Sequence, residues 1–132
     1  MSDLLAKGWL PIEDESFMAT LGQAFQRSAG ESIETAIQTD SRHQNLAGTV
    51  HGGVIMTLVD RAIGINCRRV RADSPSATLT TTINFQRPAR TGSLLIATCR
   101  IRKSGRTMIF AEADVTADDA LIASASAIFV AS

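Results

Sequence analysis

The sequence predicts a mixed α+β fold, in which a curled and mainly antiparallel sheet wraps around one long central helix. Residues 52–70 are apolar around most of a helical circumference, which is typical of a helix that is buried on most sides. About six other segments show the alternation or the β-branched content of strands, two before this helix and four after it. Short turns between consecutive strands favour antiparallel pairing, and a single helix this apolar must be covered by the sheet.

The composition is that of one globular domain. Of the 132 residues 45% are hydrophobic and 20% are charged, and 13 basic residues balance 13 acidic ones. A chain of this length can bury a sufficient core without disulfides, and zero net charge gives no electrostatic footprint for nucleic acid or an anionic membrane. We therefore expect a single domain over residues 1–132, with a loosely ordered segment at residues 1–11.

The N-terminal residues contain no basic head followed by an apolar run, and no stretch approaches the roughly 20 apolar residues that span a bilayer. We therefore expect a cytoplasmic protein. Cys67 and Cys99 lie far apart in the sequence, each within an apolar run, and are expected to be reduced packing residues. Neither a metal-ligand spacing nor a glycine-rich phosphate-binding pattern is present, so we expect no metal and no cofactor.

A short helix and two strands are expected before the long helix. Residues 12–20 favour a helix, because acidic residues near its N-terminus interact well with the helix dipole. Residues 22–28 and 32–39 are typical of two strands joined at a turn through Gly30. The loop that follows is polar, and His43 is expected to be solvated there.

Four strands are expected after the long helix, which ends in basic residues and is broken at residues 73–75. Threonines favour a strand over residues 78–86, because β-branched side chains fit a pleated surface, and strict alternation places Thr78, Thr80 and Thr82 on one face. Small residues on one face of the last strand would let a helix pack closely. The expected strands are residues 78–86, 94–103, 106–117 and 121–131, with turns at Ser104-Gly105 and Asp118-Asp119.

Asp60 lies two turns inside the apolar helix, and none of its neighbours three or four residues away is a cation. A carboxylate buried there is costly unless another group satisfies it, and such carboxylates gather at functional sites. Asp60 is therefore the candidate nucleophile or general base. The alternative is a structural acid that pairs across an interface with Arg87, Arg90 or an arginine at the helix end.

The long helix begins at Gly52-Gly53. Free backbone N–H groups and the positive end of the helix dipole can polarise a carbonyl oxygen bound there. Glycine also lets a bulky ligand approach the backbone closely. The alternative is a simple tight turn before a helix.

The residues around this turn resemble the signature of hotdog-fold acyl-CoA thioesterases, most closely the phenylacetate-pathway type. The matching positions are Asn45, Gly48, His51, Gly52, Gly53, Thr57, Leu58 and Asp60. Residues 84–92 are similar to the family's third-strand ending, and the resemblance covers residues 17–131. It implies a helix enclosed by a curled antiparallel sheet, subunits that join their sheets edge to edge, and two such dimers in a homotetramer.

The resemblance also implies hydrolysis of an acyl-CoA to a carboxylic acid and free coenzyme A. Similar enzymes place the carboxylate of Asp60 against a thioester bound at the glycine turn of the neighbouring subunit. Asn45 would hold the attacking water or the thioester, His51 would position the turn and touch the carbonyl, and Thr78 lies near a hydroxyl that orients water. Asn45 can instead cap its loop, and His51 can be a satisfied loop histidine.

Coenzyme A carries phosphates, so basic residues are expected at the mouth of the site. Strand ends and a hairpin tip can surround such a mouth. Each basic residue there can instead be a solvated surface charge. The candidates are Arg87, Arg90, Lys103 and Arg106, with Gly53 and Thr78 as further substrate contacts.

Two other functions fit the same segment. A hotdog-fold dehydratase or hydratase would use a histidine and a carboxylate as acid and base, and would change a double bond instead of releasing a thiol. A non-catalytic acyl-CoA-binding protein would bind without turnover. Apolar pocket residues alone do not distinguish aryl, short and medium acyl groups.

Overall fold

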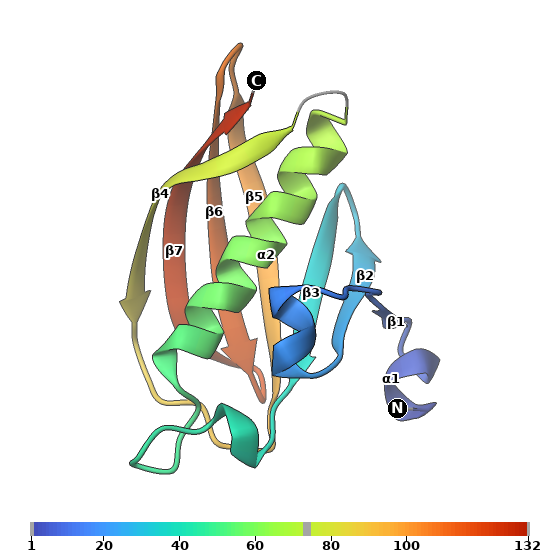
Figure 1. Cartoon of the computed structure of the whole chain (residues 1–132), viewed down its shortest axis with the longest axis vertical. Coiled ribbons are helices and arrows are strands. Elements are labelled where there is room, and N and C mark those ends of the chain that lie inside the picture. Colours follow the sequence, from blue (N-terminus) through green and yellow to red (C-terminus); the bar gives the residue numbers. More distant parts are fainter. Residues whose placement is uncertain (1, 73–74, 132) are drawn as a thin grey trace.

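The computed structural model describes residues 2–72 and 75–131 (Figure 1). One long helix, α2 (Gly52–Val70), lies across one face of a seven-stranded antiparallel sheet with the order β1-β2-β3-β5-β6-β7-β4. The predicted α+β class is confirmed, and β1 is the strand that the sequence did not predict. The strands are β1 (Leu10–Pro11), β2 (Ala24–Ala29), β3 (Ser32–Gln38), β4 (Ser76–Phe85), β5 (Leu94–Ser104), β6 (Met108–Ala117) and β7 (Ala120–Ala131).

The core lies between α2 and the sheet. Small residues of β7, among them Ala123 and Ala127, are buried beneath the helix, as the sequence predicted. The buried Asn66 then ties α2 to the β2–β3 hairpin, because its amide accepts from Ile33 N at 3.0 Å and donates to Ile33 O at 2.9 Å. The apolar side chains that α2 contributes are Val54, Ile55, Leu58, Val59, Ala62, Ile63 and Cys67.

Residues 1–11 were expected to be loosely ordered, and the described part of this segment is instead packed. It forms a short helix, α1 (Ser2–Ala6), and β1, which pairs with β2. Trp9 is 1% exposed and lies with Phe25 in a small cluster separate from the main core, and the guanidinium carbon of Arg27 lies 4.1 Å from its ring centroid. An aromatic side chain of this size contributes enough burial to order a short segment.

The chain next crosses to the α2 side of the sheet. The helix predicted over residues 12–20 is shorter and begins later, as the 3₁₀ helix η1 (Phe17–Leu21). Asp14 accepts hydrogen bonds from the Ser16 backbone N and hydroxyl at 2.8 and 2.6 Å, and this local turn competes with helix at residues 14–16. Met18 of η1 is buried in the core.

His43 is buried, not solvated as predicted. It lies in the 3₁₀ helix η2 (Ser41–His43), where Nδ1 accepts from Asp40 N at 2.9 Å and Nε2–H donates to Leu21 O at 2.7 Å. Because His51 N also donates to His43 O at 2.7 Å, this residue fixes the loop that leads into α2.

The predicted turn at Asp118-Asp119 is confirmed, with φ values of 51° and 64° that match a type I′ hairpin. The β5–β6 turn lies later than predicted, because Gly105 N donates to Met108 O at 2.8 Å and a bulge between Ile101 and Lys103 shifts the register. Of the predicted break at residues 73–75, Asp73 and Ser74 lie outside the described residues.

Cys67 and Cys99 are free and buried, which confirms their prediction as packing residues. Burial raises the pKa of the Cys67 thiol to about 11 and that of Cys99 to about 12. No helix in the described part of the chain is both long and apolar enough to cross a membrane.

Candidate active site

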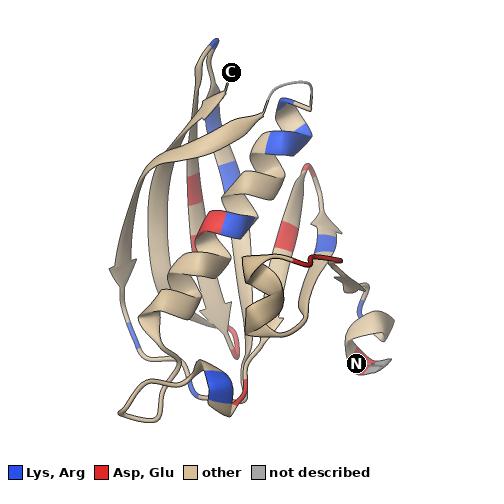
Figure 2. Ribbon diagram, viewed as in Figure 1, with Lys and Arg blue, Asp and Glu red and all other residues tan. Residues whose placement is uncertain are grey.

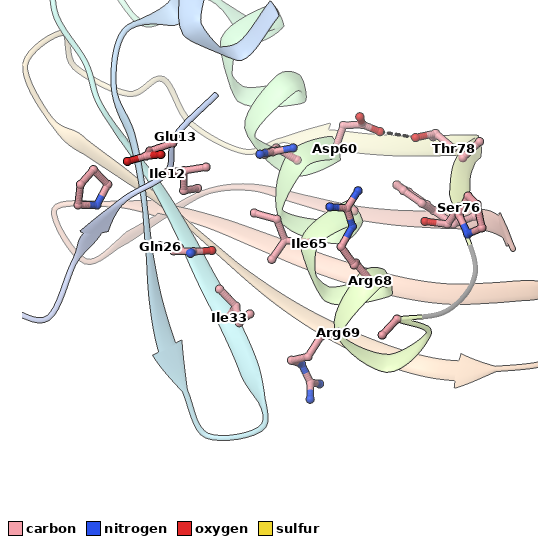
Figure 3. A pocket seen from close by; sticks show the side chains of 17 residues that line it. Ile12, Glu13, Gln26, Ile33, Asp60, Ile65, Arg68, Arg69, Ser76 and Thr78 are labelled. Carbon is pink, nitrogen blue, oxygen red and sulfur yellow. Dashed lines mark hydrogen bonds between the residues drawn. The ribbon is translucent and has the colours of Figure 1, made fainter. Parts of the chain in front are cut away.

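Asp60 lies on the one stripe of α2 that the sheet does not cover. The exposed residues Met56, Asp60 and Arg68 and the half-buried Gly64 lie along it at intervals of four residues. The expectation of a carboxylate in a buried setting is therefore wrong for the single chain. Thr78 of β4 donates a hydrogen bond from Oγ1 to Asp60 Oδ1 at 2.6 Å (Figure 3), and no described residue donates to Oδ2.

A β-bulge brings Thr78 to Asp60. Thr78 pairs with the buried Phe129 and Thr80 with Ile128, so the register of β4 against β7 shifts at Leu79. The extra residue turns Thr78 toward α2, while Thr80 points to the other face of the sheet. The prediction that Thr78, Thr80 and Thr82 share one face is therefore wrong for Thr78.

The N-terminus of α2 offers one free backbone donor. His51 is the N-cap, and its Nδ1 accepts from Gly53 N at 2.8 Å, so the proton of a neutral His51 ring is on Nε2. No acceptor for the Gly52 N–H is found among residues 2–72 and 75–131. His51 therefore positions the turn, and Gly52, not Gly53, presents the available N–H.

An open cavity of about 420 Å³ lies against this turn, between the loop before α2 and the end of β4. A Cβ on Gly52 would lie 3.2 Å from Phe85 Cζ, so glycine permits the close contact between α2 and β4. Asn45 also lines this cavity, but its Oδ1 accepts from Ala47 N at 2.9 Å and Thr49 N at 3.1 Å. Asn45 therefore caps its own loop in this structure, which is the alternative role predicted from the sequence for this residue.

Asp60 and Gly52 do not meet within one chain. They are eight residues apart on α2, which is about 12 Å along the helix axis. Asp60 borders two cavities, a groove of about 1000 Å³ and a smaller cavity of about 430 Å³, and Gly52 lines neither. A single chain therefore contains the two halves of the predicted site, separated by two turns of helix.

The four predicted phosphate-binding residues also separate. Arg87 lines the cavity at the N-terminal end of α2, and the Arg90 backbone bridges to Thr49 in the same region. Lys103 is the last but one residue of β5, at the opposite end of α2. There the Arg71 guanidinium donates to the carbonyl oxygens of Gly105 and Arg106 at 2.6 and 3.0 Å. Figure 2 shows basic residues in these two regions.

Sequence reasoning missed two basic residues that line the large groove with Asp60. The basic end of α2 was explained by the helix dipole, and an arginine there was considered only as a structural partner of Asp60. Arg68 and Arg69 are nevertheless both exposed on the groove wall. The sequence spacing could have placed Arg68 near Asp60, because Arg68 follows Asp60 by eight residues and so lies on the same helix face.

Comparison with known proteins identifies the family of this chain. A Pseudomonas aeruginosa protein that is named as an esterase is 33% identical to this chain over 126 residues. The match covers 93% of this chain and 94% of that protein. Human acyl-coenzyme A thioesterase 13 is 29% identical over 102 residues, covering 76% of this chain and 73% of the human protein. The PaaI protein of E. coli superposes with a TM-score of 0.81 over 99% of this chain and 90% of its own, and at 17% identity this shows the hotdog fold alone. Residues 47–123, more than half of the chain, match the thioesterase superfamily, and the protein is a member of that family.

Proposed function

We propose that this protein is an acyl-CoA thioesterase, which hydrolyses a thioester to a carboxylic acid and free coenzyme A. The observation that carries the proposal is the Asp60 carboxylate, held by Thr78 on the uncovered stripe of α2. The first N–H of this helix, at Gly52, has no acceptor within the described parts of the chain. Membership of the thioesterase superfamily and similarity to human acyl-coenzyme A thioesterase 13 support the same reaction.

The proposal requires a second copy of the chain, because Asp60 and Gly52 are too far apart in one. Strand β4 has one side without a partner strand in the described chain, and its Leu79 and Phe85 are 56% and 50% exposed. We propose that two copies pair antiparallel along β4. With Thr78 opposite Phe85 of the partner subunit, each Asp60 approaches the cavity beside the other chain's Gly52. Assembly of two dimers into a homotetramer is a further prediction from the family resemblance.

In the proposed reaction the thioester carbonyl oxygen accepts a hydrogen bond from the Gly52 N–H, and this donor stabilises the oxyanion that forms. The free Oδ2 of Asp60 either takes a proton from an attacking water or attacks the carbonyl carbon itself. In the first route the water oxygen bonds to carbon, the carbon–sulfur bond breaks, and the thiolate leaves and recovers a proton. In the second, Oδ2 bonds to the carbonyl carbon, the carbon–sulfur bond breaks, and the thiolate leaves and takes up a proton. Water then hydrolyses the mixed anhydride, which releases the carboxylic acid and restores the Asp60 carboxylate.

The test is thiol release from a panel of acyl-CoA and aryl-CoA thioesters by wild type and by Asp60→Asn. We expect turnover by wild type, and a loss of at least about 100-fold in the variant, which is the scale of a lost general base. Size-exclusion chromatography controls for assembly. Products with a gained or lost double bond and no free thiol would instead show a dehydratase or hydratase, and CoA-ester binding without any turnover would show a non-catalytic binder.

A further inference from the structure

The uncovered stripe of α2 continues past the candidate catalytic carboxylate. Asp60, Gly64 and Arg68 follow one another at single-turn intervals, and all three line the groove of about 1000 Å³. Thr78 (Figure 3) lines it as well, and so does Phe129. The stripe from Asp60 to Arg68 is about 12 Å long, since each residue rises about 1.5 Å along the helix.

Gly64 has no steric reason to be glycine. A Cβ placed there would lie 3.8 Å from the nearest atom, Phe129 Cε2, which is an ordinary van der Waals contact, and its φ is not left-handed. Glycine is among the poorest residues for a helix interior, so it weakens α2 without solving a packing problem. Its effect is to leave a furrow open between Asp60 and Arg68.

The basic side chains along this part of α2 differ in their partners. Arg61 pairs with Asp14 at 3.4 Å, and Arg71 is occupied by the β5–β6 turn. Arg68 has no anionic partner among residues 2–72 and 75–131, and Figure 3 shows it directed along the groove toward Asp60, whereas Arg69 points away. The other acid on the groove, Glu13, lies on the opposite wall. Arg68 is therefore an exposed cation at one end of the furrow, without an anionic partner in the described part of the chain.

We infer that this furrow holds the pantetheine arm of the acyl-CoA and that Arg68 binds its phosphates. The inference rests on the proposed function and gives the substrate a direction along α2. A planar guanidinium binds phosphate oxygens in pairs, and the uncharged arm needs only an open path past Gly64. The acyl group then lies on the other side of Asp60, in the cavity of about 430 Å³ lined by Phe17, Met18 and Met56 among others.

Isothermal titration with free CoA and with pantetheine tests the inference without turnover. For Arg68→Gln we expect the Kd of CoA to rise at least about 10-fold, the scale of a lost charge-assisted hydrogen bond, and the Kd of pantetheine to stay unchanged. Arg100→Gln is the matched control, because Arg100 pairs with Glu112 and Asp114 away from the groove. The inference is overturned if Arg68→Gln leaves CoA affinity unchanged, if Arg87→Gln alone causes the loss, or if wild type binds CoA no more tightly than pantetheine.

Gly64→Ala provides an independent test. Replacing a poor helix former with alanine should raise Tm by about 2–4 °C. The added methyl group should at the same time weaken binding of both CoA and pantetheine several-fold. A raised Tm with unchanged affinity for both ligands would show that no arm lies in the furrow. Arg68-dependent CoA binding without thiol release would overturn the proposed function and leave this inference standing. The opposite outcome is turnover in which Arg68→Gln changes KM equally for an acyl-CoA and for the corresponding N-acetylcysteamine thioester, which lacks the phosphates. That result would support the proposed function and overturn this inference.

Discussion

Replacing Thr78 with valine tests the geometry of the candidate site, because the exchange removes a hydroxyl and keeps a branched shape. That hydroxyl donates to Asp60 Oδ1 at 2.6 Å. A hydrogen bond to a charged group contributes about 1.5–3 kcal/mol, and water recovers part of this because both residues are exposed. We expect a loss of about 1–2 kcal/mol of transition-state stabilisation, which lowers kcat/KM about 5- to 30-fold.

The assay is thiol release from the best acyl-CoA substrate, with urea unfolding as a control for stability. Thr78→Ser keeps the hydroxyl and should retain most of the activity. Thr80→Val is the matched control, since Thr80 lies on the opposite face of the sheet, and its kcat/KM should remain within about twofold of wild type.

Two results would refute this reasoning. Equal losses in Thr78→Val and Thr80→Val would mean that the bulge at Leu79 does not separate the two side chains. Full activity in Thr78→Val, in a protein whose Asp60→Asn variant is inactive, would mean that the hydroxyl does not hold the carboxylate in its working position.

Three further outcomes are expected. Leu79→Lys, at the exposed bulge of β4, should shift the protein toward monomer in analytical ultracentrifugation and abolish thiol release, because a charge on this edge opposes strand pairing. Asn66→Ala should lower the free energy of unfolding by about 2–4 kcal/mol in urea titrations, since it leaves the Ile33 amide and carbonyl unpaired. The native protein at pH 8 should react slowly with Ellman's reagent and rapidly once unfolded, because burial raises the pKa of Cys67 to about 11 and that of Cys99 to about 12.

The long helix and most strands were predictable because their patterns are local. Apolar residues around most of residues 52–70 require cover on several sides, and the alternation in the later strands requires one buried face. The acidic turn at Asp118-Asp119 was predictable for the same reason, because two residues with positive φ complete a tight hairpin. These features depend on a few consecutive residues.

The predictions that were wrong concern residues whose environment is set by segments far away in the sequence. The alternation in β4 continues unbroken through Leu79, and the bulge is visible only in the pairing with β7. Likewise, the apolar neighbours of Asp60 on α2 predict burial, but the sheet does not cover this side of the helix and Asp60 is exposed. The burial of Trp9 depends on Phe25 and Arg27, which are far away in the sequence, so no pattern in residues 1–11 could reveal it.

The two edges of the sheet are unequal, and this inequality limits how many chains can add to one another. The β1 edge has only two residues, and one of them, Pro11, has no amide hydrogen to donate to a neighbouring strand. The ten-residue β4 edge is long enough to pair. An association that pairs β4 with β4 uses the long free edge of both sheets in the described part of the chain. Edge-to-edge pairing then stops at two chains, and a tetramer would form through other surfaces. If β4 pairs in this way, the short first strand, which ends in Pro11, disfavours addition of further chains at the other edge of the sheet.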